Sequence, residues 1–242
     1  MDVAHVTLIA IVEDEAFARF GLRKAIEEVA GFKILFEAIN GEDFFRQLEQ
    51  SKLQPDIITL DPVMPIMDGE AVQRVLRKKY PHIKVLTVSG SDHLFTIERS
   101  IVLGARGYLL KPDCNLHVEQ AIKNIMEQGY YYSEVADKKV FERVHNIPFY
   151  THPISPREKE VLINIYRGYS YKEMIALMHV SEETIKGYKK TLCEKLRLHS
   201  KEDLILFALK NEIYPPPTYN LGKYLRGLIF SSGLFPALPS SR

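Results

Sequence analysis

Carboxylate, hydroxyl and lysine side chains directly follow short apolar runs in the first half of the sequence. The residues are Glu13, Asp14, Asp61, Ser89 and Lys111. Three carboxylates brought together would repel one another unless a cation joined them, and hard oxygen ligands of this kind suit Mg²⁺. A lysine and a hydroxyl beside them can bind the remaining oxygens of a phosphoryl group. These residue types therefore predict Mg²⁺-assisted chemistry on a phosphoryl group, provided that the fold gathers them.

The elements around these residues alternate in a regular way. Apolar runs cover 6–12, 33–37, 56–60, 83–88 and 106–110, and amphipathic segments lie near 16–29, 41–51, 68–79, 93–103 and 115–129. Five repeats of strand and helix predict an α/β fold, a doubly wound parallel sheet with helices on both faces. Ligands of such sheets bind beyond the carboxyl ends of the strands, which is where the five residues stand.

Four motifs at these strand ends carry a family resemblance. They are Glu13-Asp14, D-P-V-M-P-I-M-D-G at 61–69, Ser89-Gly90 and G-Y-L-L-K-P at 107–112. Together they resemble the receiver domain of two-component response regulators over about residues 5–130. The resemblance implies a flavodoxin-like, five-stranded receiver that is phosphorylated on an aspartate by a sensor histidine kinase.

The resemblance also implies the roles of individual residues. Asp61 would accept the phosphoryl group, and Glu13, Asp14 and Asp61 would hold Mg²⁺ together with the backbone carbonyl of Val63. Lys111 would pair with the phosphoryl group. Apart from accepting and losing this group autocatalytically, the protein is not expected to be an enzyme.

A second set of residues would form the conformational switch. By the same resemblance, Ser89 hydrogen-bonds the phosphoryl group, and Tyr108 is the aromatic residue that turns inward when that hydroxyl moves. The Lys111–Pro112 peptide is expected to be cis. Pro62 departs from the aliphatic residue that is usual after the acceptor, and it removes one backbone N–H beside the phosphoryl group.

The second half of the sequence contains four helix starts, each opened by a serine: Ser155, Ser170, Ser181 and Ser200. Three of these serines precede an acidic residue by three positions, which is the pattern of a capping box or a close variant of it. Four short helices in about 60 residues predict a small all-α domain. The second and third helices have the spacing of a helix-turn-helix.

The third of these helices, near 182–197, has an apolar and a basic face. Ile185, Tyr188, Leu192 and Leu196 recur at helical spacing and should be core, whereas lysines lie on the other side. The motifs S-P-R-E-x-E-V-L, G-x-S-x-K-E-M-I-A, V-S-x-x-T-I-K and K-L-x-L-x-S-K resemble the LuxR-type DNA-binding domain over 154–212. This combination of domains is that of the NarL/FixJ class. The residues that the resemblance assigns to DNA are Thr184, Lys186, Lys189, Lys190 and Lys201.

These observations predict four segments: a receiver at 1–130, a linker at 131–153, a helix-turn-helix domain at 154–212 and a tail at 213–242. The tail could dock on the protein, lie on a membrane surface or be disordered. Residues 1–130 hold 15 basic and 19 acidic residues, and residues 152–213 hold 11 and 9. The basic balance of the second half permits contact with nucleic acid.

The remaining bulk properties favour the cytoplasm. Cys114 and Cys193 stand alone, which fits a reducing compartment, and no apolar run is long enough for membrane insertion. The sequence therefore predicts a phosphorylation-controlled transcription regulator that dimerises on DNA when phosphorylated. Two alternatives are an aspartyl-phosphate hydrolase or phosphotransferase, and a phosphorylation-independent DNA-binding protein with a vestigial receiver.

Overall fold

The structure, a computed structural model, describes residues 6–150 and 153–213. The described chain divides into two compact units, one ending at Lys138 and the other beginning at Lys139. This division falls inside the expected linker, and the predicted domain limits stay a prediction. Beyond Ile213 the predicted tail lies outside the described residues. Within the described ranges, no helix has both the length and the apolar character required to cross a bilayer.

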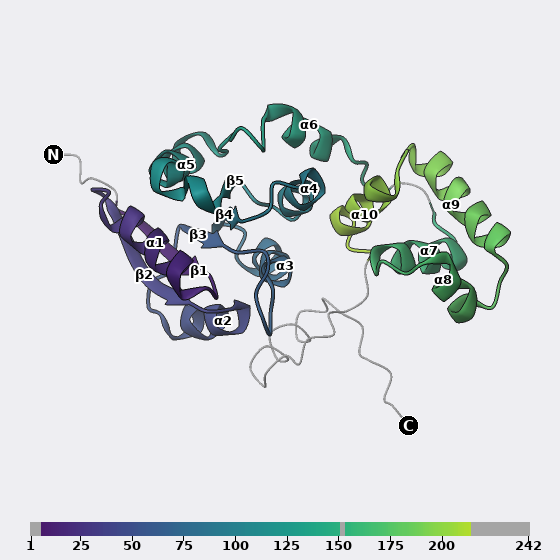
Figure 1. Cartoon of the computed structure of the whole chain (residues 1–242), viewed down its shortest axis with the longest axis horizontal. Helices are drawn as coiled ribbons and strands as arrows, with labels where there is room; N and C mark the ends of the chain where they lie inside the picture. Colours follow the sequence, from purple (N-terminus) through teal and green to yellow (C-terminus); the bar gives the residue numbers. More distant parts are fainter. Residues whose placement is uncertain (1–5, 151–152, 214–242) are drawn as a thin grey trace, which may run out of the picture. The chain divides into compact units, whose positions relative to one another are not determined.

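The first unit is built on a five-stranded parallel sheet in the order β2-β1-β3-β4-β5 (Figure 1). The strands are β1 (Thr7–Val12), β2 (Phe32–Ala38), β3 (Ile57–Leu60), β4 (Lys84–Ser89) and β5 (Gly107–Leu110). The order reverses between β1 and β3, so a crevice opens beyond the carboxyl ends of these two strands. The predicted doubly wound fold is confirmed.

Helices cover both faces of this sheet. They are α1 (Ala16–Glu27), α2 (Gly41–Gln50), α3 (Gly69–Lys79), α4 (Leu94–Val102) and α5 (Cys114–Gln128), with the short 3₁₀ helix η1 (Lys111–Asp113) after β5. Alternation along β1 divides the core. Ile9 and Ile11 pack with apolar residues of α1 and α5, whereas Ala10 and Val12 pack with those of α2 and α3. Because both faces are buried, the strands are apolar almost throughout.

The loop between β3 and α3 lies tightly against the end of β3. A Cβ at Gly69 would collide with the carbonyl oxygen of Asp61 and would lie 2.8 Å from the Cα of Pro62. The amide of Gly69 donates to the carbonyl of Pro62 at 3.2 Å. Ile66 has a φ of 69°, a left-handed conformation that is strained for a β-branched residue. The backbone of this loop is therefore fixed close to Asp61.

The second unit is helical throughout: α6 (Lys138–Asn146), α7 (Pro156–Tyr166), α8 (Tyr171–Met178), α9 (Glu182–Leu196) and α10 (Lys201–Lys210). Ser155, Ser170 and Ser200 each form a reciprocal capping box, and Ser181 caps α9 through the amide of Thr184. Each cap satisfies backbone donors that a helix start leaves open. The four predicted helix starts are thus confirmed.

Helix α6 is held to α10 by side chains at the end of α10. The Lys210 ammonium donates to the carbonyls of Val144, His145 and Ile147 at 3.3, 2.7 and 2.6 Å. The first two carbonyls belong to the carboxyl end of α6 and the third directly follows that helix, where a cation is favourable. Asn211 donates to the carbonyl of Pro148 at 3.0 Å. The segment after α6 is therefore a packed part of the second unit.

The close approach at Gly69 leads to a stability prediction. Gly69→Ala should lower the free energy of unfolding of the first unit by about 1–3 kcal/mol, because the backbone must move to accommodate the added methyl group. Gly21 in α1, where an added Cβ meets nothing within 4 Å, is the matched control. Gly21→Ala should raise stability by about 0.5–1 kcal/mol. Urea titration with hydrogen exchange of the β1 and β3 amides measures both changes, and equal stabilities would contradict the packing described.

Candidate functional site: an acidic crevice and a recognition helix

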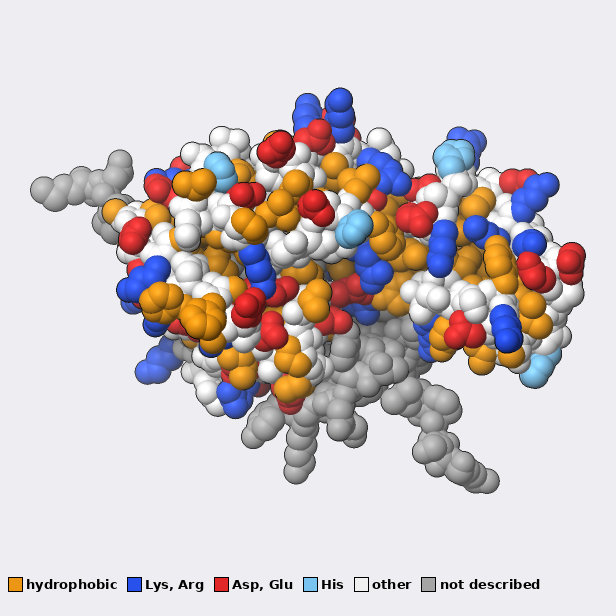
Figure 2. Space-filling model, viewed as in Figure 1, with side chains coloured by type: hydrophobic (Ala, Val, Ile, Leu, Met, Phe, Trp, Pro, Cys, Tyr) orange, Lys and Arg blue, Asp and Glu red, His pale blue; other side chains and the backbone are white. Residues whose placement is uncertain are grey.

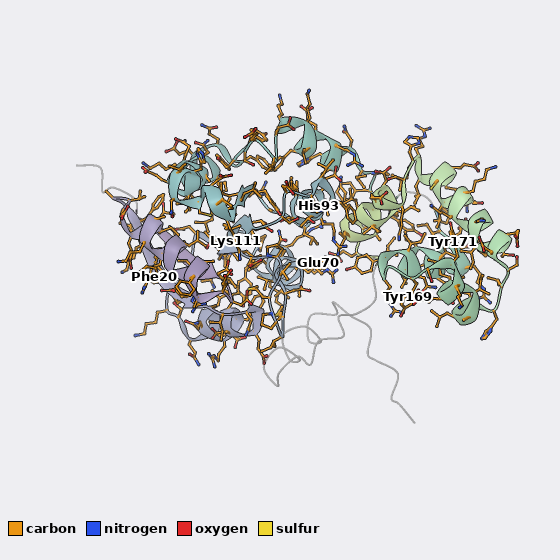
Figure 3. All side chains as sticks on the ribbon, in the orientation of Figure 1. Phe20, Glu70, His93, Lys111, Tyr169 and Tyr171 are labelled. Carbon is orange, nitrogen blue, oxygen red and sulfur yellow. The ribbon has the colours of Figure 1, made fainter. Side chains whose placement is uncertain are left out.

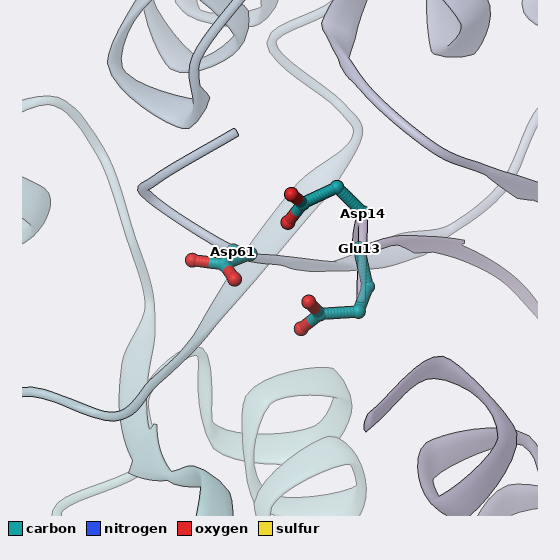
Figure 4. Close-up of side chains that lie close together, drawn as sticks. All are labelled: Glu13, Asp14 and Asp61. Atoms are coloured by element: carbon teal, nitrogen blue, oxygen red, sulfur yellow. The ribbon is translucent and has the colours of Figure 1, made fainter. Parts of the chain in front are cut away.

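Three carboxylates converge at the crevice beyond β1 and β3 (Figure 4). Glu13 and Asp14 directly follow β1 and Asp61 directly follows β3, and each offers an oxygen within 4.8 Å of the others. Glu13 and Asp61 are buried, whereas Asp14 is exposed. An oxygen-rich cluster with one open side is the kind of site that Mg²⁺ occupies while it keeps several waters.

Lys111 from η1 supplies the positive charge of the crevice (Figure 3). Its Nζ lies 2.7 Å from Oδ2 of Asp61 and 2.9 Å from Oε1 of Glu13. Burial alone would lower the pKa of Lys111, but the hydrogen bonds to these two carboxylates outweigh it and raise the pKa. Burial also raises the pKa of Glu13 to about 7, against the opposing effect of Lys111. Two buried carboxylates are thus held together by one ammonium group.

Backbone groups complete the setting of Asp61. The amide of Val63 donates to Oδ1 of Asp61 at 2.9 Å, while the Val63 side chain is 76% exposed. Since Pro62 has no N–H, this is the backbone donor that remains beside the carboxylate. The assignment of the Val63 carbonyl as a metal ligand stays a prediction.

Arg19 is a positioning residue that the sequence analysis missed. Its guanidinium donates to the carbonyls of Glu13 and Asp14 at 2.8 and 3.2 Å and pairs with Glu37 at 3.4 Å. It therefore fixes the backbone of the acidic turn without touching the carboxylates. Its position in the first turn of α1, immediately after the acidic pair, is the signal that could have found it.

Ser89 and Tyr108 lie on the two neighbouring strands β4 and β5. The register pairs Leu60 of β3 with Thr87 of β4, so Ser89 reaches the same sheet edge as Asp61. The hydroxyl of Tyr108 donates to the carbonyl of Ser91 at 2.7 Å, and the amide of Ser91 donates to Oγ of Ser89 at 3.2 Å. Both side chains are buried, and burial raises the pKa of Tyr108. Ser91 therefore connects the two predicted switch residues.

The Lys111–Pro112 peptide differs from the expectation. It is trans, as is every other peptide bond of the described residues. Pro112 instead occupies the first turn of η1, where its fixed φ suits a helical turn. The prediction of a cis bond is wrong.

A groove of about 210 Å³ lies beside Lys111, lined mostly by α1 and the start of α5. Phe17, which lines this groove, is 88% exposed. Phe20 on the same helix, labelled in Figure 3, is 51% exposed. Cys114 in the wall is buried, which raises the pKa of its thiol to about 12. Apolar rings on the surface next to a charged crevice suit contact with another protein.

The second candidate site is the outer face of α9. Thr184, Lys186 and Lys190 of α9 are exposed, as is Lys201 at the start of α10, and Lys189 of α9 is half-buried. Lys186 pairs with Glu182 at 2.7 Å, so acidic residues interrupt the basic face, and Figure 2 shows this mixture of charges over the second unit. Ile185, Leu192 and Leu196 are buried as predicted. Tyr188 is only half-buried, because it lies at the margin of the apolar stripe rather than in it.

Glu158 connects the start of α7 to the end of α9. Its carboxylate accepts from the amide of Ser155 at 2.7 Å and from Nζ of Lys195 at 2.7 Å, although it is only 3% exposed. Burial acts to raise the pKa of Glu158, but these hydrogen bonds outweigh it and lower the pKa. The pairing of Lys195 with Glu158 was not predicted from the sequence, since 37 residues separate the two.

Comparisons with known proteins identify two families along the chain. Residues 9–123 match the family described as "Response regulator receiver domain", and residues 152–208 match "Bacterial regulatory proteins, luxR family". The chain is 28% identical to the transcriptional regulatory protein DegU of Brevibacillus brevis, over 84% of this chain and 93% of that protein. It is 24% identical to the response regulator UvrY of Escherichia coli, over 84% and 94%.

A solved structure supports the fold. RcsB from Salmonella enterica serovar Typhimurium, bound to a promoter in the presence of a phosphomimetic, superimposes with a TM-score of 0.62 at 19% identity, covering 85% of this chain and 99% of that one. These findings define the class: a two-component response regulator, which is a regulator rather than a catalytic enzyme. The chain belongs to it through a receiver domain of the response regulator family followed by a DNA-binding domain of the luxR family.

The buried carboxylate of Glu158 leads to a prediction about the second unit. Glu158→Gln should lower its free energy of unfolding by about 1–3 kcal/mol, because the bond to Lys195 loses its charge. Since the folded pKa of Glu158 is depressed, its stabilisation is present above the unfolded pKa of about 4.3 and is lost as the pH falls through the folded value. Hydrogen exchange of the α7 and α9 amides between pH 3 and 7 measures this loss. The stability difference between wild type and Glu158→Gln should shrink as the pH falls.

The matched control is Glu160→Gln on the same helix. Glu160 forms a surface ion pair with Arg157 at 2.8 Å, and its loss should change stability by less than about 0.5 kcal/mol. Equal effects of the two substitutions would contradict the structural role of Glu158.

Proposed function

We propose that Asp61 accepts a phosphoryl group from a phosphohistidine of a sensor histidine kinase, and that this controls DNA binding by the second unit. The observation that carries the proposal is the contact of Lys111 with Asp61 and Glu13 at 2.7 and 2.9 Å, in a crevice that also contains Asp14. Glu13, Asp14, Asp61 and the Val63 carbonyl would hold Mg²⁺, which when bound neutralises charge on the transferring group.

The proposed phosphoryl transfer uses the groups of this crevice. The carboxylate of Asp61 attacks phosphorus in line as the nitrogen–phosphorus bond of the donor breaks. Lys111, already within hydrogen-bond distance of Asp61, orients the incoming oxygens. The groove beside Phe17 gives the donor protein access to the crevice. Hydrolysis of the acyl phosphate returns Asp61, so the chain promotes its own phosphorylation and dephosphorylation and no other reaction.

The switch would act through Ser91. A phosphoryl oxygen on Asp61 would attract the hydroxyl of Ser89, whose Oγ now accepts from the Ser91 amide. Moving Ser89 would shift Ser91 and with it the carbonyl that holds the hydroxyl of Tyr108. The effect of the phosphoryl group, which itself carries a charge of about −2, would thus be passed to the surface around α4 and β5 through these two hydrogen bonds.

DNA would bind to the outer face of α9. Thr184 and Lys186 approach base edges near the start of the helix. Lys189 and Lys190, together with Lys201 at the start of α10, contact phosphates or bases. Two observations support these contacts. Four of the five side chains are exposed, and α9 is anchored by the bond of Lys195 to Glu158 and by the burial of Ile185, Leu192 and Leu196. Because acidic residues lie among the lysines, the electrostatic share of affinity should be moderate.

The functional form on DNA would be a homodimer, since one small helix-turn-helix unit gives limited contact area and specificity. The protein would act in the cytoplasm. The surface around Tyr108 and helix α10 are the candidate interfaces. Residues 204–209 of α10 are all buried, so dimerisation through α10 would use its polar residues or require its apolar side chains to become exposed.

Phosphorylation of Asp61 is tested by intact mass. Wild type treated with acetyl phosphate and Mg²⁺ should gain about 80 Da, the mass of one phosphoryl group. Asp61→Asn should gain nothing, and omission of Mg²⁺ should suppress the gain on wild type. Asp92→Asn, an exposed aspartate, is the control and should behave as wild type. An adduct on Asp61→Asn would show that another residue is the acceptor.

DNA binding through α9 is tested by titration over a range of salt concentrations. Lys186→Ala should weaken binding by about 1–3 kcal/mol if it meets a base, and Lys190→Ala should reduce the salt slope by about 1 if it meets a phosphate. Lys123→Ala in α5 removes the same charge from the first unit and should have no effect. Undiminished binding by both α9 variants would mean that another surface binds DNA.

A further inference from the structure

The middle of α9 contains a glycine that the folded chain does not require. Gly187 has a helical backbone with no positive φ, and a Cβ added there meets no heavy atom within 4 Å. A glycine inside a helix costs stability relative to alanine. Neither the backbone geometry nor the packing of the described residues therefore requires a glycine at position 187.

Gly187 occupies the centre of the outer face of α9. The buried residues Ile185, Leu192 and Leu196 define the inner face, and at 3.6 residues per turn Gly187 lies opposite them. Its neighbours one turn away are Glu183, Thr184, Lys190 and Thr191. The position that would set the closest approach of α9 to a partner therefore has no side chain.

The two threonines beside Gly187 have their hydroxyls engaged within the helix. Oγ1 of Thr191 donates to the carbonyl of Gly187 at 3.0 Å, and Oγ1 of Thr184 lies 3.1 Å from Oγ of Ser181. Each threonine also carries a methyl group, and Thr184 is exposed and Thr191 half-buried. Thr184, Gly187 and Thr191, which we call the notch, therefore place two small side chains around a glycine that has none, next to Lys190 and Glu183.

We infer that this notch receives the 5-methyl group of a thymine in the major groove, which makes Gly187 a specificity-determining position. The inference rests on the proposed function of α9 as the helix that meets DNA. Thymine is the base whose major-groove edge carries a methyl group, and small apolar groups are its usual contacts. A glycine at the centre of the contact face lets the backbone approach closely enough to enclose that methyl group.

The test uses the full chain, treated with acetyl phosphate and Mg²⁺, and a duplex that wild type selects from a random pool. Each thymine of this duplex is replaced in turn by deoxyuridine, which lacks only the methyl group. Wild type should lose about fourfold in affinity at one position, the equivalent of one buried methyl group. Gly187→Ala should bind the thymine duplex about fourfold more weakly than wild type and should no longer distinguish thymine from deoxyuridine there.

Stability measurements separate this effect from damage to the fold. The unfolding midpoint of Gly187→Ala should equal or exceed that of wild type. Gly21→Ala in α1, an equally open helical glycine, should leave affinity and discrimination unchanged. Wild-type indifference to every replacement, or full discrimination by Gly187→Ala, overturns the inference while leaving α9 as the DNA-binding helix. If Lys186→Ala and Lys190→Ala also bind undiminished, the proposed function of α9 falls as well.

Discussion

The first unit depends on one electrostatic constraint: Glu13 and Asp61 are buried beside each other at the point where the strand order reverses. Burial of two carboxylates is costly, and it raises the pKa of Glu13 to about 7. Lys111 offsets part of that cost by contacting both. The surrounding structure keeps the groups in place, because Arg19 holds the backbone of the acidic turn and Gly69 lets α3 begin against Asp61. A crevice that needs more positive charge than it contains is suited to a cation and a phosphoryl group.

The second unit uses a buried charge for a different purpose. Glu158 is saturated by the Ser155 amide and by Lys195, so it locks α7 to α9 and offers nothing to a reactant. The outer face of α9 is then rigidly presented, with capped ends and a bare backbone at Gly187. In the first unit three carboxylates share one ammonium group, that of Lys111. In the second unit the buried carboxylate of Glu158 has its own lysine, Lys195. This contrast separates a site that does chemistry from one that recognises a surface.

Strong local patterns explain how much could be predicted from the sequence. The strands begin and end within one or two residues of the apolar runs, and Ser155, Ser170 and Ser200 form the capping boxes that their spacing indicates. Contacts between distant residues could not be predicted, because local spacing says nothing of the pair of Lys195 with Glu158 or of Arg19 on the acidic turn. Local conformation that tertiary packing imposes was also missed: Ile66 has a positive φ, and the bond before Pro112 is trans.

The central claim is that phosphorylation of Asp61 changes the state of the second unit, and its most direct test is DNA affinity measured together with oligomeric state. A ligand or modification shifts an equilibrium only if the two states differ in free energy of interaction with it. Wild type in which mass spectrometry shows a phosphorylated Asp61 should bind its selected duplex more tightly and sediment as a dimer, and Asp61→Asn given the same treatment should do neither. Unchanged affinity and an unchanged sedimentation coefficient, with Asp61 fully phosphorylated, would contradict the account and favour a vestigial receiver.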